Sequence, residues 1–500
     1  MAIIKAEAVD GSFVEFCDDR LAGSGTMKDV YFSPDGNYVA AFFRKRPDQV
    51  SLDRLNMITG IYREQIFEGA NGSYWEDIYC WPQRIISHEG QIGIVVPSYD
   101  ECFFFQFGSK NNDFLKIKGK EKQGKWFASA NNRFRFLDER EVGDWRSMIN
   151  IMVSIARGVR RLHAAGLAHS DLSYKNILVS PSEGRAAIID LDGLVVPGKY
   201  PPDVTGTPDF IAPEVVETSH LAQFDENKKY PNIFADRHAL AVLAYQYLFL
   251  RHPLRGKRVH DTDPQQDELL TMGRNALFVE HPTDSSNTID FQNARDTERR
   301  WYDTNALPYT LAGPYLSKLF ERSFLEGLHK PSFRPTADDW EVALTKTLDL
   351  LVPCSNKQCS EKWFVYDNSL RPTCPFCKVK SVHKLLILNF YSERAPQKYV
   401  SDNHRLVAHD ESEFYQWHKN RFVQPNEKVS SEQCTPLASV SLSGDDFYLE
   451  NRGIPALRVV DANQDIPIGT KVKLTNGIKL LTGFDAGDRV IHVQLVADTV

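Results

Sequence analysis

Long hydrophobic runs are missing from this 500-residue sequence. The longest apolar stretch, residues 239–250, is interrupted by Gln246 and is about half the roughly 20 residues that a helix needs to cross a bilayer. The first residues, MAIIKAEAVDGSF, include an acidic side chain and no apolar run with a cleavage site, unlike a secretory signal. These absences predict a cytoplasmic protein without a membrane partner.

Excess positive charge is also absent. The chain has 59 Lys and Arg residues against 66 Asp and Glu residues, a formal net charge of -7. Proteins that bind nucleic acid through its phosphates are usually basic, so nucleic acid is not expected as a partner. The 42% apolar and 25% charged residues are typical of folded proteins, and 500 residues exceed one hydrophobic core. The sequence therefore predicts two to four domains.

Cysteine is scarce, with eight residues, and half of them fall into two closely spaced pairs, Cys354 with Cys359 and Cys374 with Cys377. Such clustering does not suit a disulfide framework and favours a metal site in a reducing compartment. Four thiolates on two turns fit tetrahedral structural Zn²⁺, which leaves no position open for water. We predict a zinc ribbon over residues 351–382; four buried cysteines without metal are the alternative.

The pattern of apolar residues changes along the chain. Short alternating runs with turns at Asp35-Gly36 and Gly90 predict a strand-rich first hundred residues, interrupted by one helix over residues 52–67. In the middle of the chain, apolar residues at three- and four-residue spacing predict helices, of which residues 239–250 form a buried one. After residue 383, short β-type runs separated by Gly, Asn and Asp predict an all-β domain. The predicted fold class is α+β.

The segment GLAHSDLSYKNILVS, followed by AAIID, carries three polar side chains suited to phosphoryl transfer, Asp171, Asn176 and Asp190. It resembles the catalytic loop and metal-binding motif of protein kinases, and the resemblance implies a two-lobed fold that uses ATP and Mg²⁺. One carboxylate, Asp171, would orient the attacking hydroxyl. An amide and a second carboxylate, Asn176 and Asp190, would hold Mg²⁺ against the phosphates. Asp192 is the alternative to Asp190.

Two positions depart from the kinase pattern. Ser170 stands where kinases usually have Arg, so pairing of that Arg with a phosphorylated activation loop is not implied, and Asp190-Leu191-Asp192-Gly193 replaces Asp-Phe-Gly. An isolated Asp or Asn in a loop is more often a turn or cap residue, but further matches follow in kinase order. GTPDFIAPE resembles the end of the activation segment, and the segment from Asp236 resembles a buried kinase helix. The resemblance also implies an ion pair between Glu214 and Arg334.

The phosphate-binding end of the predicted nucleotide pocket is unusual. Gly23-Ser24-Gly25 resembles the kinase glycine-rich loop, but Lys28 stands where a third glycine would be. In YVAAFF, the match to the usual Val-Ala pair puts Phe42 where kinases have lysine. Because Lys28 shares a strand face with Val30, the chain resembles the "with no lysine" kinases, and we predict that Lys28 contacts the phosphates. Arg44 is the alternative phosphate contact. If Lys28 has no binding role, it is a solvated loop lysine.

The resemblance implies further contacts to the nucleotide. Val30 and Ala40 would cover the adenine. The hinge that receives the adenine through backbone hydrogen bonds is expected near Val96 and Tyr99, where Pro97 can accept but not donate.

An acidic partner for Lys28 is expected on the single helix of this region. Glu64 is the first choice, while Glu68 and Glu76 compete with it. An exposed helix carboxylate without function is the alternative.

The tail contains DFYLEN, ALRVV and TKVKLTNG, which resemble the second half of a forkhead-associated β-sandwich. Its phosphothreonine-binding elements have no clear counterpart, so a protein-interaction module is the expectation. The predicted domains are an N-lobe at 1–97, a C-lobe at 98–350, the zinc ribbon at 351–382 and the β-sandwich at 383–500.

These resemblances imply an active Ser/Thr protein kinase that acts on a protein hydroxyl, with Asp171 as base. The chain is similar to bacterial kinases encoded beside von Willebrand A-like proteins and metal-dependent phosphatases, which are therefore implied as partners. A pseudokinase or signalling scaffold is the alternative, motivated by Phe42 and Ser170. A small-molecule kinase is disfavoured by GTPDFIAPE, although Ser173 stands where Ser/Thr kinases usually have Lys.

Overall fold

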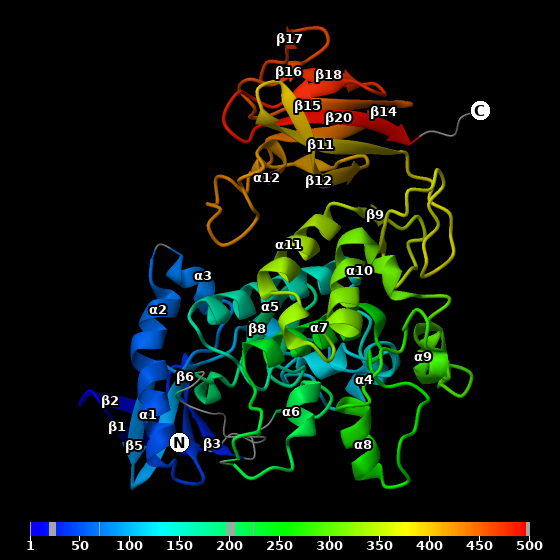
Figure 1. Ribbon diagram of the computed structural model, residues 1–500. Helices are drawn as coiled ribbons and strands as arrows, with labels where there is room; N and C mark the ends of the chain where they lie inside the picture. Colours follow the sequence, from blue (N-terminus) through cyan, green and yellow to red (C-terminus); the bar gives the residue numbers. More distant parts are fainter. Residues whose placement is uncertain are drawn as a thin grey trace. The chain divides into compact units, whose positions relative to one another are not determined.

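The computed structural model describes residues 2–19, 27–69, 71–196, 199, 206–223 and 225–496. The chain divides into two compact units, many of whose elements are labelled in Figure 1. The first unit comprises Met1–Gly143, Ser147–Tyr309 and Lys318–Glu341. The second comprises Asp144–Arg146, Thr310–Ser317 and Val342–Val500. Both predicted kinase lobes fall almost entirely in the first unit, and the finer division into four domains stays a prediction.

The first unit begins with an antiparallel six-stranded sheet in the order β2-β1-β5-β6-β4-β3. The two outer strands approach each other, because Phe16 on β2 contacts Tyr31 on β3 with ring centroids 5.4 Å apart. Gly36 and Gly90 take positive φ values of 76° and 81°, which confirms the predicted turns. The strands are β1 (Ile3–Ala8), β2 (Phe13–Cys17), β3 (Lys28–Phe32), β4 (Tyr38–Phe43), β5 (Arg84–His88) and β6 (Gln91–Pro97).

Helices connect β4 to β5 and confirm the predicted helical segment, with a break. Asp48 caps the N-terminus of α1 (Gln49–Met57) by accepting a hydrogen bond from the Ser51 backbone N–H. The chain kinks at Gly60, where φ is -99° and ψ is -107°, before α2 (Arg63–Phe67) and α3 (Gly72–Glu76) follow. Glycine tolerates this backbone conformation because it lacks a Cβ atom.

The remainder of the first unit is mainly helical. Its longest helix after α5 is α7, whose apolar residues face all directions and are almost all buried, as predicted for this segment. The helices and strands that lie wholly or partly in the first unit are α4 (Lys110–Asp113), α5 (Trp145–Ala164), β7 (Ile177–Ser180), β8 (Arg185–Ile188), α6 (Pro213–Glu217), α7 (Ile233–Phe249), α8 (Pro264–Met272), α9 (Asp296–Tyr302), α10 (Gly313–Glu321) and α11 (Ala337–Leu348). Short turns of tighter or wider helix lie at Ile58–Tyr62, Glu101–Phe103, Gly124–Trp126, Asn131–Phe136, Leu191–Gly193, Ser285–Asn287, Tyr309–Ala312, Arg322–Glu326 and Pro331–Phe333.

The long stretch between α7 and α10 is held by one buried arginine. Arg251 forms an ion pair with Glu280 at 2.7 Å, and its guanidinium also donates to the backbone carbonyls of Trp301 and Leu307. Glu280 in turn accepts a hydrogen bond from the Tyr309 backbone N–H at 2.9 Å. Because a buried charge is stable only when it is paired, this network fixes a stretch that has little regular structure.

The second unit contains a short hairpin and two antiparallel sheets. Strands of both sheets contribute to one buried cluster that includes Leu388, Val440 and Leu449. The hairpin is formed by β9 (Leu351–Pro353) and β10 (Trp363–Val365). The first sheet is ordered β12-β11-β20-β19-β16-β17 and the second β13-β14-β15-β18. Their elements are β11 (Leu385–Ala395), β12 (Lys398–Ala408), β13 (Glu413–Phe414), α12 (Gln416–Lys419), β14 (Ala438–Ser443), β15 (Asp446–Asn451), β16 (Arg458–Val459), β17 (Gln464–Asp465), β18 (Lys471–Leu474), β19 (Lys479–Leu481) and β20 (Arg489–Val496).

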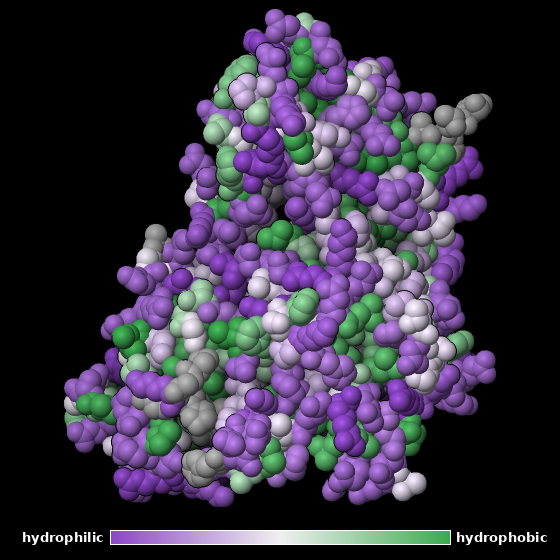
Figure 2. All heavy atoms as spheres, viewed as in Figure 1, coloured by the Kyte–Doolittle hydropathy of each residue, from purple (hydrophilic) through white to green (hydrophobic). Residues whose placement is uncertain are grey.

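Within the described ranges, no helix combines the length and hydrophobicity that a bilayer span requires. The face drawn in Figure 2 is largely hydrophilic, with apolar side chains scattered among the polar ones. This distribution is ordinary for a folded protein surface.

Candidate active site

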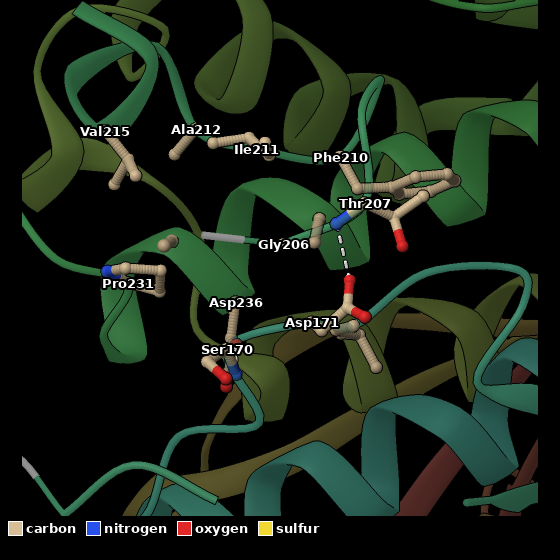
Figure 3. Close-up of a pocket in the computed structure, with 13 residues that line it drawn as sticks. Ser170, Asp171, Gly206, Thr207, Phe210, Ile211, Ala212, Val215, Pro231 and Asp236 are labelled. Carbon is tan, nitrogen blue, oxygen red and sulfur yellow. Dashed lines mark hydrogen bonds between the residues drawn. The ribbon is translucent and has the colours of Figure 1, made fainter. Parts of the chain in front are cut away.

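Asp171 and Asn176 meet in the loop between α5 and β7, as the sequence predicts. The Asn176 side-chain amide donates to the Asp171 backbone carbonyl and to its Oδ2, both at 2.9 Å. The other carboxylate oxygen, Oδ1, accepts a hydrogen bond from the Thr207 backbone N–H at 2.5 Å, drawn in Figure 3. Two hydrogen bonds therefore fix the orientation of the Asp171 carboxylate next to a pocket that Gly206, Ile211 and other residues line.

The loop that carries Asp171 is anchored to α7 by Asp236. This buried carboxylate accepts hydrogen bonds from the backbone N–H groups of His169, at 2.7 Å, and Ser170, at 3.0 Å. The His163 ring nitrogen Nε2 lies 3.1 Å from the same carboxylate. Ser170 adopts a left-handed conformation with φ of 70°, so these bonds hold a backbone that is otherwise unfavourable for a residue with a Cβ atom.

Asp190 lies two residues after the end of β8, beside the Asp171 loop. The Ile189 backbone N–H donates to the Asn176 carbonyl at 3.0 Å, and the His169 Nε2 lies 3.1 Å from the Ile189 carbonyl. Because the carbonyl can only accept, this His169 nitrogen carries the proton. Asp190 itself is in the left-handed region, with φ of 62°, and its side chain is half-exposed. The structure thus brings Asp171, Asn176 and Asp190 together.

Lys28 reaches the same place from the N-terminal sheet. Its ammonium lies 2.6 Å from Asp192 Oδ1 and 3.3 Å from Asp190 Oδ1, and its side chain is only 16% exposed. Burial alone would lower the pKa of Lys28, but the carboxylates of Asp192 and Asp190 outweigh it and raise the pKa. Lys28 is therefore charged at neutral pH, and its phosphate-binding role stays a prediction.

The face of β4 that lies next to Lys28 and Val30 carries different side chains from those predicted. Lys28 is opposite Phe43 and Val30 is opposite Ala41 in the β3–β4 pairing. Val30 packs with Ala41 and with Leu55 on α1. Ala40 and Phe42 instead lie in a separate cluster with Phe16, on the other face of the sheet. The prediction that Ala40 and Phe42 face the nucleotide pocket is wrong by one residue, and Phe43, whose ring lies 5.3 Å from the Lys28 ammonium, stands there.

The residues predicted at the hinge lie against the strands of the catalytic loop. Val96 and Tyr99 pack on a buried cluster that includes Leu178 and Ile189. Burial raises the pKa of Tyr99 well above its usual value, so its hydroxyl is neutral. This packing places the end of β6 next to the Asp190 strand, while the adenine contacts of these residues stay predictions.

Other residues predicted for the site lie elsewhere in the structure or outside the residues that it describes. The three candidate glutamates, Glu64, Glu68 and Glu76, are exposed, and Asp192 rather than any of them lies against Lys28. Arg44 pairs with Asp29 at 3.0 Å, and the alternation along β4 puts it on the face opposite Lys28. Gly23, Ser24 and Gly25 lie outside the described residues.

The predicted ion pair between Glu214 and Arg334 is confirmed. The two guanidinium nitrogens lie 2.8 and 2.7 Å from the two carboxylate oxygens, a bidentate geometry. Arg334 is fully buried and also donates to the Gly327 and Phe234 carbonyls. The pair ties the start of α6 to the segment before α11.

The four clustered cysteines are brought together in the second unit. Their sulfur atoms all lie within 4.8 Å of one another, with the Cys354 and Cys377 sulfurs 3.4 Å apart and those of Cys359 and Cys374 3.9 Å apart. Such a closed set of four sulfur donors fits a structural Zn²⁺ ion. Neighbouring residues hold the turns in place: the Trp145 backbone N–H donates to Glu361, and its ring contacts Phe376.

Comparison with known proteins relates the part of the chain that contains this site to a protein family. The protein kinase domain family matches residues 127–306, a segment that contains Asp171, Asn176, Asp190 and Glu214. That segment is protein-kinase-like. The chain is 31% identical over 81 residues to a dual serine/threonine and tyrosine protein kinase of Apis mellifera, which is 16% of this chain and 8% of that protein.

Two further relatives agree with this match. A probable myosin light chain kinase of Dictyostelium discoideum is 39% identical over 70 residues, 13% of this chain and 22% of that protein. Human serine/threonine-protein kinase H2 is 38% identical over 77 residues, 14% of this chain and 20% of that protein. The chain thus spans at most about a fifth of the length of these curated relatives.

Two features of the kinase-like site were missed from the sequence. Thr207, whose backbone binds Asp171, lies in the GTPDFIAPE segment, but nothing in its spacing indicates this contact. Asp192 was considered only as a metal ligand, although its side chain lies against Lys28. A second carboxylate two residues after Asp190 was the available signal.

Proposed function

We propose that the chain is an ATP- and Mg²⁺-dependent Ser/Thr protein kinase. The observation that carries the proposal is the meeting of Asp171, Asn176, Asp190 and Lys28 at one place. A base, two oxygen ligands and a cation are the groups that phosphoryl transfer requires. The match of residues 127–306 to the protein kinase domain supports the same conclusion.

In the proposed reaction, the Asp171 carboxylate accepts a hydrogen bond from a Ser or Thr hydroxyl and takes its proton as that oxygen attacks the γ-phosphorus of ATP. The bond between the γ-phosphorus and the β,γ-bridging oxygen breaks, and ADP leaves with the bonding electrons. The Thr207 N–H and the Asn176 amide keep the carboxylate oriented during this step. Lys28 supplies positive charge to the phosphate oxygens once it leaves Asp192.

Asn176 and Asp190 are the residues that would hold Mg²⁺. The Asn176 amide nitrogen is used by Asp171, which leaves its Oδ1 as a hard oxygen donor, and the half-exposed Asp190 carboxylate offers another. A bound magnesium ion would neutralise charge on the phosphates.

Transfer of radioactive phosphate from ATP to a generic protein substrate tests the proposal. We expect Asp171→Ala to reduce kcat by at least about a hundredfold, as loss of a general base does. Lys175→Ala is the matched control, because Lys175 is exposed in the same loop. Equal transfer by the wild type and Asp171→Ala would contradict the role of Asp171 as the general base.

A pseudokinase or signalling scaffold is the second candidate. It is favoured by Ser170 in place of Arg and by the contacts of Lys28 with Asp190 and Asp192, which occupy the groups that would bind Mg-ATP. Nucleotide binding in the wild type without any phosphate transfer would select this candidate. A small-molecule kinase is selected if transfer to sugars or amines replaces transfer to protein.

The proposal extends to the second unit and to the setting of the protein. The cysteine cluster serves as a zinc ribbon, and the two sheets as a forkhead-associated-like module that binds proteins; the sulfur geometry and the shared core support these assignments. A cytoplasmic location, and von Willebrand A-like and phosphatase partners, belong to the same proposal. Co-purification of such partners with the tagged full chain tests this part.

A further inference from the structure

One exposed surface of the first unit has no part in the proposed phosphoryl transfer. It joins the start of α7 to the turn Pro331–Phe333, which lies against that helix. Phe234 is 39% exposed and Phe333 is 51% exposed, so both rings lie partly in water. The Arg237 guanidinium lies 5.0 Å from the Phe234 ring, and the Lys330 ammonium lies 5.8 Å from the Phe333 ring. We call these two phenylalanines and two cations the arginine–phenylalanine surface.

The two halves of this surface are joined by Arg334. Its guanidinium donates to the Phe234 backbone carbonyl at 3.0 Å and also forms the bidentate pair with Glu214. Phe333 directly precedes Arg334 in the chain. Because Arg334 is fully buried, its hydrogen bonds hold the turn against α7, and the two exposed rings belong to one surface.

Positive charge at this surface exceeds the negative charge of its neighbours. Arg334 is paired with Glu214, and Arg322 is paired with Asp339 at 3.3 Å. Arg237 is the third arginine of this group and has no carboxylate of its own among the described residues. Burial lowers the pKa of Arg237, and the charges of Arg322 and Arg334 lower it further, against the opposite effect of Asp339. Arg237 is therefore a surplus cation.

The free donors of Arg237 and Lys330 define what the surface can bind. Within the described ranges, the buried Nε of Arg237 has no hydrogen-bond partner, and no carboxylate is paired with Lys330. A partly buried charge without a counter-ion is unfavourable. A carboxylate bound here would remove that cost, and apolar atoms next to it would take the exposed parts of the two rings out of water.

The surface begins on the turn of α7 that borders the candidate active site. Ala235 and Asp236 line the pocket beside Asp171 (Figure 3). Phe234 and Arg237 are three residues apart on the same helix and therefore share one of its faces. A protein held on this face has its neighbouring residues near Asp171 at a raised local concentration.

We propose that the arginine–phenylalanine surface is a docking site for an acidic segment of the protein substrate that also carries apolar side chains. Carboxylates of the segment bind Arg237 and Lys330, and its apolar side chains pack on Phe234 and Phe333. A nucleic acid would require a longer basic track, and this chain is acidic overall, with a net charge of -7. The inference rests on the proposed kinase function, since it names the class of substrate for that site.

Fluorescence anisotropy of the labelled peptide EEDLFEE with the full chain tests docking without any catalytic step. The peptide QQNLFQQ keeps the apolar side chains and removes the charges. We expect EEDLFEE to bind at least about tenfold more tightly than QQNLFQQ, and its affinity to fall as salt is added. Arg237→Gln should weaken binding of EEDLFEE at least about tenfold, because a charge-assisted contact is lost. Phe333→Ala, at an exposed position where the fold tolerates the change, should weaken it several-fold.

Arg140→Gln is the matched control. The Arg140 guanidinium also lies over an exposed phenylalanine, 3.7 Å from the Phe107 ring, but Asp138 compensates its charge through hydrogen bonds of 2.8 and 3.0 Å. This variant should bind EEDLFEE as the wild type does. Equal binding of the two peptides, or unchanged binding in the folded Arg237→Gln and Phe333→Ala variants, would overturn the proposal. A wild-type dimer in light scattering that Arg237→Gln dissociates would instead assign the surface to a second copy of the chain.

Phosphate transfer separates this proposal from the proposed function. A protein substrate fused to EEDLFEE should have a lower KM than the same substrate fused to QQNLFQQ, with kcat unchanged, and Phe333→Ala should remove the difference. Charge-dependent peptide binding without any phosphate transfer would overturn the kinase function alone. Transfer with the same KM for both fusions would overturn the docking site alone.

Discussion

At the scale of single residues, the lysine of the candidate active site carries the most specific hypothesis. The resemblance to protein kinases implies a lysine on the strand that corresponds to β4, but the β4 residue opposite Lys28 is Phe43. Lys28 is the cation that the described structure places against Asp190 and Asp192. A cation is needed there, because the phosphates of ATP bring negative charge close to two carboxylates.

Removal of the Lys28 cation should slow phosphate transfer. We expect Lys28→Met to lower kcat/KM for phosphate transfer by about a hundredfold or more, in the range seen when one electrostatic contact to a transition state is lost. Arg44, the alternative to Lys28 as the phosphate-binding cation, directly follows β4 and is paired with Asp29 on the other face of the sheet, so Arg44→Met should retain most of the activity. Affinity for a fluorescent ATP analogue gives a second readout. Full activity in Lys28→Met, or loss of activity in Arg44→Met alone, would reverse the assignment.

At the scale of elements, a feature could be predicted when the residues that form it lie close together in the sequence. Asp171, Asn176 and Asp190 lie within twenty residues of one another, and their spacing alone placed them in one loop and one strand end. The facing of β4 could not be predicted, because YVAAFF is apolar at nearly every position and both alternations look buried. The partner of Lys28 is 164 residues away in sequence, a contact that no local pattern indicates.

The pair that joins α6 to the segment before α11 gives a test at this scale. Glu214→Gln leaves the fully buried Arg334 without its counter-charge, so we expect the first unit to lose about 3 kcal/mol of unfolding free energy, the low end for a broken buried pair. Urea denaturation followed by tryptophan fluorescence measures the change. Glu217→Gln, at an exposed position of the same helix, is the control and should have little effect.

The double variant Glu214→Gln with Arg334→Met separates charge from packing. Because it removes both charges, it should recover part of the stability lost in Glu214→Gln alone. Stability lower than that of the single variant would mean that the hydrogen bonds of Arg334 to Gly327 and Phe234 matter more than the pair.

At the scale of the whole molecule, the division into two units predicts that the units can lose structure separately. The hairpin β9–β10 buries Leu351, Val352, Phe364 and Val365, so we expect the order of the turns that carry the four cysteines, rather than that of the hairpin, to depend on what the sulfur atoms bind. In small zinc domains, the metal supplies about 10–16 kcal/mol of apparent folding free energy. A Zn²⁺ ion held by Cys354, Cys359, Cys374 and Cys377 would therefore be a large stabilising contribution to these turns.

Metal analysis should find one zinc per chain, and a strong chelator should remove it. We then expect faster hydrogen exchange in residues 351–382, while exchange around Asp171 and affinity for nucleotide stay unchanged, because those residues belong to the other unit. Cys374→Ser should reproduce the effect of the chelator, since that sulfur is buried within the cluster, whereas Cys434→Ser should not, since Cys434 is exposed and outside it. If the purified chain holds no zinc and its cysteine segment is nevertheless protected from exchange, then the packing of Trp145 on Phe376 and its backbone bond to Glu361 suffice to order the segment.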